Sequence, residues 1–484
     1  MKRFFRKTLV SLARFALALI VLLLIFYGEE DWRGARDWAT CQRELATKGE
    51  SLDLRQLAPP GKPEDDLSKA PIYSPVYQNV GWDKVPINKA RVELDSDSYG
   101  QVPKNTFLKG EPLDLAAWQK YYRSKPKSGL AQTSDSPARD VLQVLSQFDP
   151  ELNDVYAAVS NPNACFPIDY EMPFGTRFSA VTSMIPIAKI LQLKSVAHLE
   201  NNQLDQAERS YLLSFRISQP LTKGCFLVNY LVIAGVRSID DSILWEGLHR
   251  HAWTDTDLRE VESALAANDM LALAADCFRI ERASFLKAMD VAQKVDANME
   301  RRLSVAGVRS LVEPSLWRPR GWWDEDRVNY SLTAQKWING LNLQQGTLSP
   351  AAFPQHKLAS YIDDNQATDI SLWSRIYIPL SASTIPGLEN AGPTIARAET
   401  YRRLARLACR IEEYRISHGQ YPDKLDDLPD LPAHLNQEVL NEQPFRYQRQ
   451  GDGYKLYSLG WSQKDNGGVL AANPWRGNWP WPSP

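Results

Sequence analysis

The chain has 484 residues, 44% of them hydrophobic, and a formal net charge of −2. This content is enough for a substantial core, and the length favours about two domains. Beyond residue 14 there are 51 basic and 58 acidic residues, so the bulk of the chain is mildly acidic, which argues against a nucleic acid partner.

The N-terminus has the pattern of a membrane anchor. Leu9 to Tyr27 is an apolar run of 19 residues that only Ser11 and Arg14 interrupt. As a helix it spans roughly 28 Å, about the thickness of a bilayer core. The basic residues that precede or enter the run are Lys2, Arg3, Arg6, Lys7 and Arg14. Their excess predicts a cytoplasmic N-terminus.

We therefore expect residues 1–28 to form a cytoplasmic tip and a single-pass transmembrane helix in a bacterial inner membrane. Residues 9–27 would contact the lipid bilayer, and the bulk of the chain would be extracytoplasmic (periplasmic). The alternative is a cleaved signal peptide. No A-x-A site follows the run, and Phe26-Tyr27 with the acidic stretch 28–31 is poor cleavage context, so we favour an uncleaved anchor.

Residues 29–130 are predicted to form an irregular layer wrapped on the main body. A short helix is expected over Asp31–Lys48 and another near Asp114–Arg123. Prolines interrupt the remainder: Pro59, Pro60, Pro63, Pro71, Pro75 and Pro86. A flexible spacer is the alternative, but the aromatic side chains favour packing: Tyr73, Tyr77, Trp82 and Trp118.

Residues 131–390 are predicted to be a helical body without a sheet of four or more strands between 134 and 380. Ser136-Pro137 is typical of a helix start. Apolar periodicity predicts helices near 137–148, 184–199, 204–218, 226–249, 255–267 and 269–305. The short turns between them favour antiparallel neighbours.

One helical hairpin, residues 188–217, resembles a tetratricopeptide-type helix pair. Its turn is 200–203, and Ala207, Tyr211 and Ser214 match the small, aromatic and small positions of that family's second helix. The pattern occurs once convincingly, whereas such repeats need neighbours to bury their faces. An ordinary helical hairpin is therefore an equal interpretation.

Residues 314–343 are rich in tryptophan and charge. Their tryptophans are Trp317, Trp322, Trp323 and Trp337. A ligand-facing or membrane-facing aromatic patch is one interpretation. We favour the core, because tryptophan at helix-packing positions is more often buried there.

Residues 391–470 are predicted to form a small α+β module, followed by a Trp/Pro-rich tail over 471–484. A helix opens at Pro393 and ends at His418-Gly419, where glycine suits a left-handed cap. A short helix is expected over Asp423–Leu428. The alternating segments 445–449 and 454–459 flank Gly451-Asp452-Gly453 and predict a β-hairpin. The predicted fold class is thus mainly α.

This module resembles the soluble domain of type II secretion pseudopilins over 393–468. The matching stretches are Tyr414-Arg415 through Gly419-Gln420-Tyr421-Pro422, and Tyr457-Ser458-Leu459-Gly460. The module also resembles the C-terminal modules of large uncharacterised membrane-anchored bacterial proteins. A pseudopilin, however, has a Gly-Phe processing site and a glutamate at the start of its apolar helix. No glycine precedes Phe15 and no glutamate follows until Glu29, so we do not expect a pilus subunit.

Cysteine and histidine give little sign of a metal or redox site. The cysteines are Cys41, Cys165, Cys225, Cys277 and Cys409, without a C-x-x-C pair. Cys277 and Cys409 suit buried apolar positions, and a Cys165–Cys225 disulfide is possible in an oxidising compartment. His249 and His251 diverge on a helix, so a surface helix end is favoured over a ligand pair.

No catalytic residue can be assigned, no cofactor is expected, and no metal is favoured. The remaining candidates for acid–base chemistry are carboxylates in apolar surroundings: Glu246, Glu281, Asp169 and Glu171. In pseudopilins the loop after the Tyr-Ser-Leu-Gly stretch binds calcium, so the resemblance implies a weak calcium site at Asp465 and Asn466. A polar turn with Asp465 as an Asx-turn acceptor is preferred.

The sequence therefore suggests two functions, of which the first is preferred. The first is an extracytoplasmic interaction or scaffold protein of the bacterial envelope, with possible protein partners there. The second is an envelope hydrolase that uses carboxylates of the helical body. A buried, converging group of Glu246, Glu281 and Asp169 would favour the hydrolase. A broad groove without carboxylates of perturbed pKa would favour the interaction protein.

Overall fold

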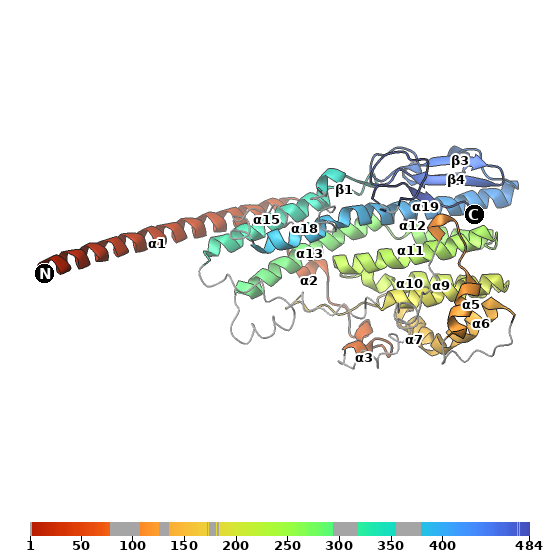
Figure 1. The fold of residues 1–484 in the computed structure, drawn as a ribbon, viewed down its shortest axis with the longest axis horizontal. Helices are drawn as coiled ribbons and strands as arrows, with labels where there is room; N and C mark the ends of the chain where they lie inside the picture. The colour runs from red at the N-terminus through yellow and green to blue at the C-terminus, as the bar shows by residue number, and fades with distance from the viewer. Residues whose placement is uncertain are drawn as a thin grey trace.

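One long helix, α1 (Lys2–Thr47), projects from the rest of the molecule at the left of Figure 1. The computed structural model describes residues 2–77, 107–124, 135–171, 173, 181, 183–293, 318–354, 379–471, 473 and 475–484. Within these residues the fold is mainly helical with small antiparallel sheets, which confirms the predicted fold class.

Helix α1 joins two segments that the sequence analysis treated separately. The apolar run and the predicted helix over Asp31–Lys48 form a single helix of 46 residues. The apolar part of α1 is not buried against the rest of the molecule. In the described part of the chain, α1 is the one helix long and apolar enough to cross a membrane. A membrane anchor and a signal sequence share these properties.

The second half of α1 packs on α15 (Arg320–Asn339), where two glycines allow the backbones to touch. A Cβ on Gly34 would overlap the backbone of Gly321, and one on Gly321 would overlap that of Glu30. The carboxylate of Glu30 accepts the indole N–H of Trp322 at 2.7 Å. Asp31 accepts the backbone N–H of Gly321 at 2.9 Å and so occupies a free donor at the start of α15.

Besides α15, the described helices of the body are α6 (Pro137–Leu145), α7 (Asp149–Val159), α9 (Met184–Glu200), α10 (Leu204–Ile217), α11 (Leu227–His249), α12 (Asp255–Ala266), α13 (Met270–Gln293) and α18 (Pro379–Glu389). Six helices of the body lie on predicted spans, whereas α7, α15 and α18 were not predicted. Local signals explain several starts: Ser136 caps α6 ahead of Pro137, and Thr254 with Asp257 forms a capping box on α12. The predicted extension of the last long helix to 305 lies outside the described residues.

The hairpin of α9 and α10 is formed as expected, with Ala207, Tyr211 and Ser214 buried. Short 3-10 turns connect the body: η5 (Ser146–Phe148), η7 (Gln219–Thr222) and η9 (Pro350–Ala352). The described sheet between 134 and 380 is a two-stranded hairpin, β1 (Leu341–Asn342) and β2 (Thr347–Leu348). Trp322, Trp323 and Trp337 are buried, as the core interpretation requires, whereas Trp317 lies outside the described residues.

The N-terminal layer is packed where it is described. Its elements are α2 (Leu54–Leu57), η1 (Leu67–Lys69), α3 (Ser74–Tyr77), η4 (Phe107–Lys109) and α5 (Leu115–Arg123). Tyr73 and Trp118 are buried. Arg123 of α5 pairs with the buried Asp140 of α6 at 2.7 Å. These contacts favour a packed layer over a spacer, while Trp82 and Pro86 lie outside the described residues.

The C-terminal region is built on α19 (Ala391–His418), which ends at Gly419 in the predicted left-handed conformation, with φ of 75°. Next come η10 (Leu425–Asp427), η11 (Ala433–Asn436), β3 (Arg446–Gln450) and β4 (Gly453–Ser458). Helix α19 packs on α11, α12 and α13, so its residues belong to the same hydrophobic core as the helical body.

Two predictions need correction, one in this region and one elsewhere in the chain. The expected tail contains β5 (Trp479–Trp481), which pairs with β4 and completes a three-stranded sheet in the order β3-β4-β5. Its two tryptophans are buried, and Pro480 is tolerated because β5 is an edge strand. The possible Cys165–Cys225 disulfide is not formed, and both thiols are free.

Candidate functional site

A cavity of about 270 Å³ lies between α11, α19 and the turn from α12 to α13. On α11 its lining follows one helical stripe, Leu231, Ala234, Ser238 and Asp241. On α19 it follows Thr394, Ala398 and Tyr401 at the same spacing. The cavity forms here because alanine, glycine and serine on the facing stripes are too short to fill the space between the helices.

The polar side chains on α11 form a buried group around Asp240 and Asp241. Arg237 donates to Asp240 at 2.9 Å and to the backbone oxygen of Phe215 at 3.1 Å, and its guanidinium lies over the Phe215 ring. Burial raises the pKa of Asp240 to about 6 against the opposing charge of Arg237. Burial and the charge of Asp240 raise the pKa of Asp241 to about 8, although Arg237 and Arg397 oppose them.

On α19 the polar side chains form a second buried group, centred on Glu399. Glu399 accepts both Nε and Nη2 of Arg402 at 2.8 Å and Nε of Arg403 at 2.8 Å. Burial would raise the pKa of Glu399, but the two guanidinium groups outweigh it and lower the pKa. Arg402 also donates to the backbone oxygen of Leu265 at 3.0 Å, which ties α19 to the end of α12.

The cavity therefore combines apolar walls with a few convergent polar groups, the composition of a small-molecule site. Asp241, Arg237, Arg397 and Arg402 are its charged lining residues. The described lining contains neither histidine nor cysteine, so a His-based or Cys-based nucleophilic pair is not assembled there. The arrangement is suited to binding.

No protein family model, curated protein or solved structure matches the chain. The site must therefore be judged on its own geometry.

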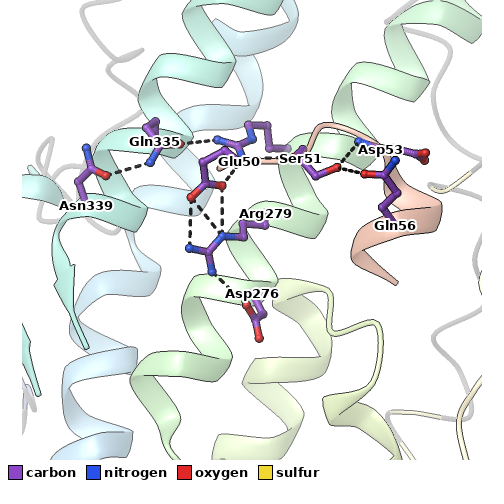
Figure 2. A network of polar contacts seen from close by, with 9 residues as sticks. Glu50, Ser51, Asp53, Gln56, Asp276, Arg279, Gln335 and Asn339 are labelled. Carbon is purple, nitrogen blue, oxygen red and sulfur yellow. Dashed lines mark hydrogen bonds and ion pairs between the residues drawn. The ribbon is translucent and has the colours of Figure 1, made fainter. Parts of the chain in front are cut away.

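A third buried polar group links the segment just beyond α1 to the body (Figure 2). Glu50, just beyond α1, accepts Nη2 of Arg282 at 2.6 Å and Nε of Arg279 at 3.1 Å. Arg282 also donates to Gln335 of α15 at 2.7 Å. Burial alone would raise the pKa of Glu50, but hydrogen bonds and charge from Arg279 and Arg282 lower it. The group joins α1, α13 and α15.

The carboxylates singled out from the sequence do not converge. Glu246 accepts the backbone N–H of Leu113 at 2.6 Å, whereas Glu281 accepts that of Leu227 at 2.8 Å. Leu227 and Glu246 lie 19 positions apart on α11, or about 28 Å along its axis. Asp169 is exposed and accepts the N–H of Glu171 at 3.0 Å. Each glutamate therefore accepts a hydrogen bond from one backbone N–H, Glu281 at the start of α11 and Glu246 near its end.

The histidine pair and the C-terminal loop are likewise accounted for by local contacts. His249 stacks on Trp245, and His251 pairs with Glu412 at 2.9 Å. Asp465 accepts the N–H of Gly467 at 2.9 Å, which is the expected Asx turn, and the N–H of Asn466 donates to Asn478. Among the described residues no group of three or more potential metal ligands is found. Calcium binding at Asp465 and Asn466 stays a prediction.

Sequence reasoning missed the acid pair Asp240-Asp241 and the Glu399 group. The available signal was two adjacent carboxylates in the apolar stretch Ile239–Ile243, and one glutamate followed by arginines at positions i+3 and i+4. Both patterns also occur on solvated helix faces, so only the packing of α11 against α19 distinguishes them.

Stability should decrease with rising pH because of Asp241. A carboxyl group with a raised folded pKa contributes stability that is present below its unfolded pKa, near 3.9, and is lost as pH rises through about 8. We expect Asp241→Asn to remove this component, worth up to about 1.4 kcal/mol per pH unit. The melting temperature should therefore fall less between pH 6 and 9 than in the wild type.

Asp452→Asn in the exposed turn between β3 and β4 is the matched control, and it should keep the wild-type pH profile. Identical pH profiles for Asp241→Asn and the wild type would contradict the assignment of the buried acid.

Proposed function

We propose that the protein is a single-pass, membrane-anchored interaction protein of the bacterial envelope, with its body outside the cytoplasm. The observation that carries this proposal is the continuity of α1. One helix contains an unburied apolar segment of membrane-spanning length and, immediately after it, the surface that packs on α15. Phe26, within the apolar run, already contacts Trp322, so the body would begin at the surface of the bilayer.

The packing also supports an anchor that is retained. Glu30 and Asp31, which make the segment after the apolar run acidic, bond to Trp322 and to the N–H of Gly321. A signal peptidase acting at the end of the apolar run would have to reach backbone that lies beside α15. The basic residues before the run favour a cytoplasmic N-terminus in the inner membrane.

The resemblance of residues 393–468 to pseudopilin soluble domains supports an envelope setting. A helix followed by a small antiparallel sheet is the arrangement that the resemblance implies, and α19 with β3 and β4 has that order. Because fold does not carry function, the resemblance supports a location and an interaction role and does not assign a pilus.

The hydrolase alternative receives less support. Burial raises the pKa of Glu281 to about 7 and that of Asp241 to about 8, which is the feature expected of the hydrolase. The carboxylates that the sequence suggested do not meet around one substrate, however, because Glu246 and Glu281 are separated by most of the length of α11. The cavity beside Asp241 has the character of a binding site. An interaction role is therefore the function that the geometry supports best.

Topology gives the first test. A phosphatase fused after Pro484 should be active, because we expect the C-terminus outside the cytoplasm, and a fluorescent protein that folds only in the cytoplasm should be dark at the same position. The membrane fraction should contain full-length protein whose N-terminal peptide is detected by mass spectrometry. An inactive phosphatase would reverse the orientation, and a chain that starts near residue 28 would identify a cleaved signal peptide.

A further inference from the structure

Asp241 has an unusual position for a buried acid. Its side chain lines the cavity between α11 and α19, and the residue is only 5% exposed. It makes no hydrogen bond or ion pair with the described part of the chain, whereas its neighbour Asp240 is bonded to Arg237 and Ser214. The carboxyl group faces the cavity, so a ligand there would supply a hydrogen-bond partner that the described part of the chain does not.

The charge around Asp241 favours an anionic partner. Arg402 and Arg403 share the carboxylate of Glu399, Asp269 is a second acid near Arg402, and of these two arginines Arg402 lines the cavity. Arg397 is half-buried and lies over the ring of Tyr401 at 5.4 Å. Among the described residues Arg237 forms an ion pair with Asp240, and it also donates to the backbone oxygen of Phe215. An ammonium ion bound to Asp241 would meet these guanidinium groups, whereas an anion would be attracted by them.

Most of the remaining lining is apolar, apart from Ser238, Asn268 and Thr394, and the space is small. Leu231, Ala234, Leu265 and Met270 form the walls. A volume of about 270 Å³ corresponds to roughly nine water molecules at about 30 Å³ each, or to a ligand of about ten non-hydrogen atoms. Apolar walls of this kind exclude a bare inorganic anion in favour of one that carries a short hydrocarbon part.

We propose that this cavity binds a small organic carboxylate with a short apolar chain. The guanidinium group of Arg397 would pair with the ligand's carboxylate, the protonated Asp241 would donate a hydrogen bond to it, and the chain would pack on Leu231 and Met270. This site goes beyond the anchoring and interaction role proposed above and does not depend on the orientation of the anchor, so either proposal can fail alone.

The test uses the full chain in phosphatidylcholine nanodiscs, with empty nanodiscs as the blank. Binding of hexanoate, hexanol, hexylammonium and inorganic phosphate is measured by calorimetry and by saturation-transfer NMR at pH 6.5. Hexanoate should bind at least tenfold more tightly than each of the other three. Tighter binding of hexylammonium would make Asp241 a cation site, tighter binding of phosphate would make the cavity an inorganic anion site, and either result would overturn the proposal.

Variants locate the binding. Arg397→Gln should weaken hexanoate binding at least tenfold, and Ala234→Phe should abolish it by filling the cavity. Arg410→Gln, on the same helix outside the cavity, is the matched control and should bind like the wild type. Melting curves check that each variant is folded, and Arg397→Lys provides a second, conservative variant that should retain part of the affinity. Unchanged binding in both Arg397→Gln and Ala234→Phe would place the ligand elsewhere.

The pH dependence tests the role of Asp241. The groups that face it are Asp240 and Arg237 on its own helix, Tyr211 on α10, and Arg397 and Tyr401 on α19. The arginines stay charged and the tyrosines stay neutral between pH 6.5 and 9. Hexanoate binding should weaken above pH 8, when Asp241 becomes an anion, and Asp241→Asn should bind with a flatter profile because its amide remains a donor. A wild-type affinity that is constant to pH 9.5 would contradict this hydrogen bond.

Discussion

Gly321→Val is expected to separate α1 from α15. A Cβ at Gly321 would overlap the backbone oxygen of Glu30, and neither helix backbone can move aside as a flexible side chain would. Overpacking costs about 1–3 kcal/mol where side chains can adjust, so we expect at least about 3 kcal/mol here. Hydrogen exchange over residues 29–47 should rise sharply, and the melting temperature of the full chain should fall.

Gly28→Ala is the matched control, because a Cβ at Gly28 meets nothing within 4 Å. It lies on the same helix and should leave both measurements unchanged, or stabilise α1 slightly through the better helix propensity of alanine. Gly34→Ala should reproduce the effect of Gly321→Val from the other side of the contact. If Gly321→Val kept the wild-type exchange pattern, the two helices would not cross at these glycines.

Glu50→Ala should be the most destabilising single truncation in the link between α1 and the body. It would leave Arg282, whose side chain is fully buried, without its carboxylate. Removing one partner of a buried ion pair typically costs about 3–5 kcal/mol, because the other charge stays buried and uncompensated. Denaturant unfolding of the full chain in detergent micelles measures this loss of stability.

Glu171→Gln provides the comparison for Glu50. Glu171 also accepts from two cations, Arg55 and Lys287, and the latter is on α13 too, but its side chain is 73% exposed. An exposed pair of this kind contributes little to stability, because water screens both charges. Similar losses for the two variants would show that burial does not determine the strength of the Glu50 contact. Because the folded pKa of Glu50 is lowered, its contribution should be present above pH 5 and lost in acid.

Several helices of the body could be predicted because their periodicity and capping residues lie within the helices themselves. Apolar periodicity defines α9, α10 and α11 to within one or two residues, and the Thr254–Asp257 capping box places the start of α12. The continuity of α1 from the apolar run to Thr47 could not be predicted from local signals. Glu30 and Asp31 look like a polar flank in the sequence, and their partners on α15 lie about 290 residues away.

The missed strand β5 has a related cause. Trp479-Pro480-Trp481 reads as a tail, since proline is rare inside sheets, and its pairing to Leu456–Ser458 depends on a loop that brings the chain back. The site was missed for the same reason. Glu246 and Asp241 lie five positions apart on one apolar helix, and only the way α19 packs on α11 decides which of them lines a cavity.

The unbroken path of α1 has a mechanical consequence. A linker of glycine and serine between span and body would let the body tumble freely above the membrane. If α1 is the membrane anchor proposed above, the helix that spans the bilayer also packs along α15, so any tilt or rotation of the span would turn the whole body through the same angle. The protein would present one constant face to its neighbours in the envelope, and its partners would meet it in a fixed orientation and at a fixed height above the lipid headgroups.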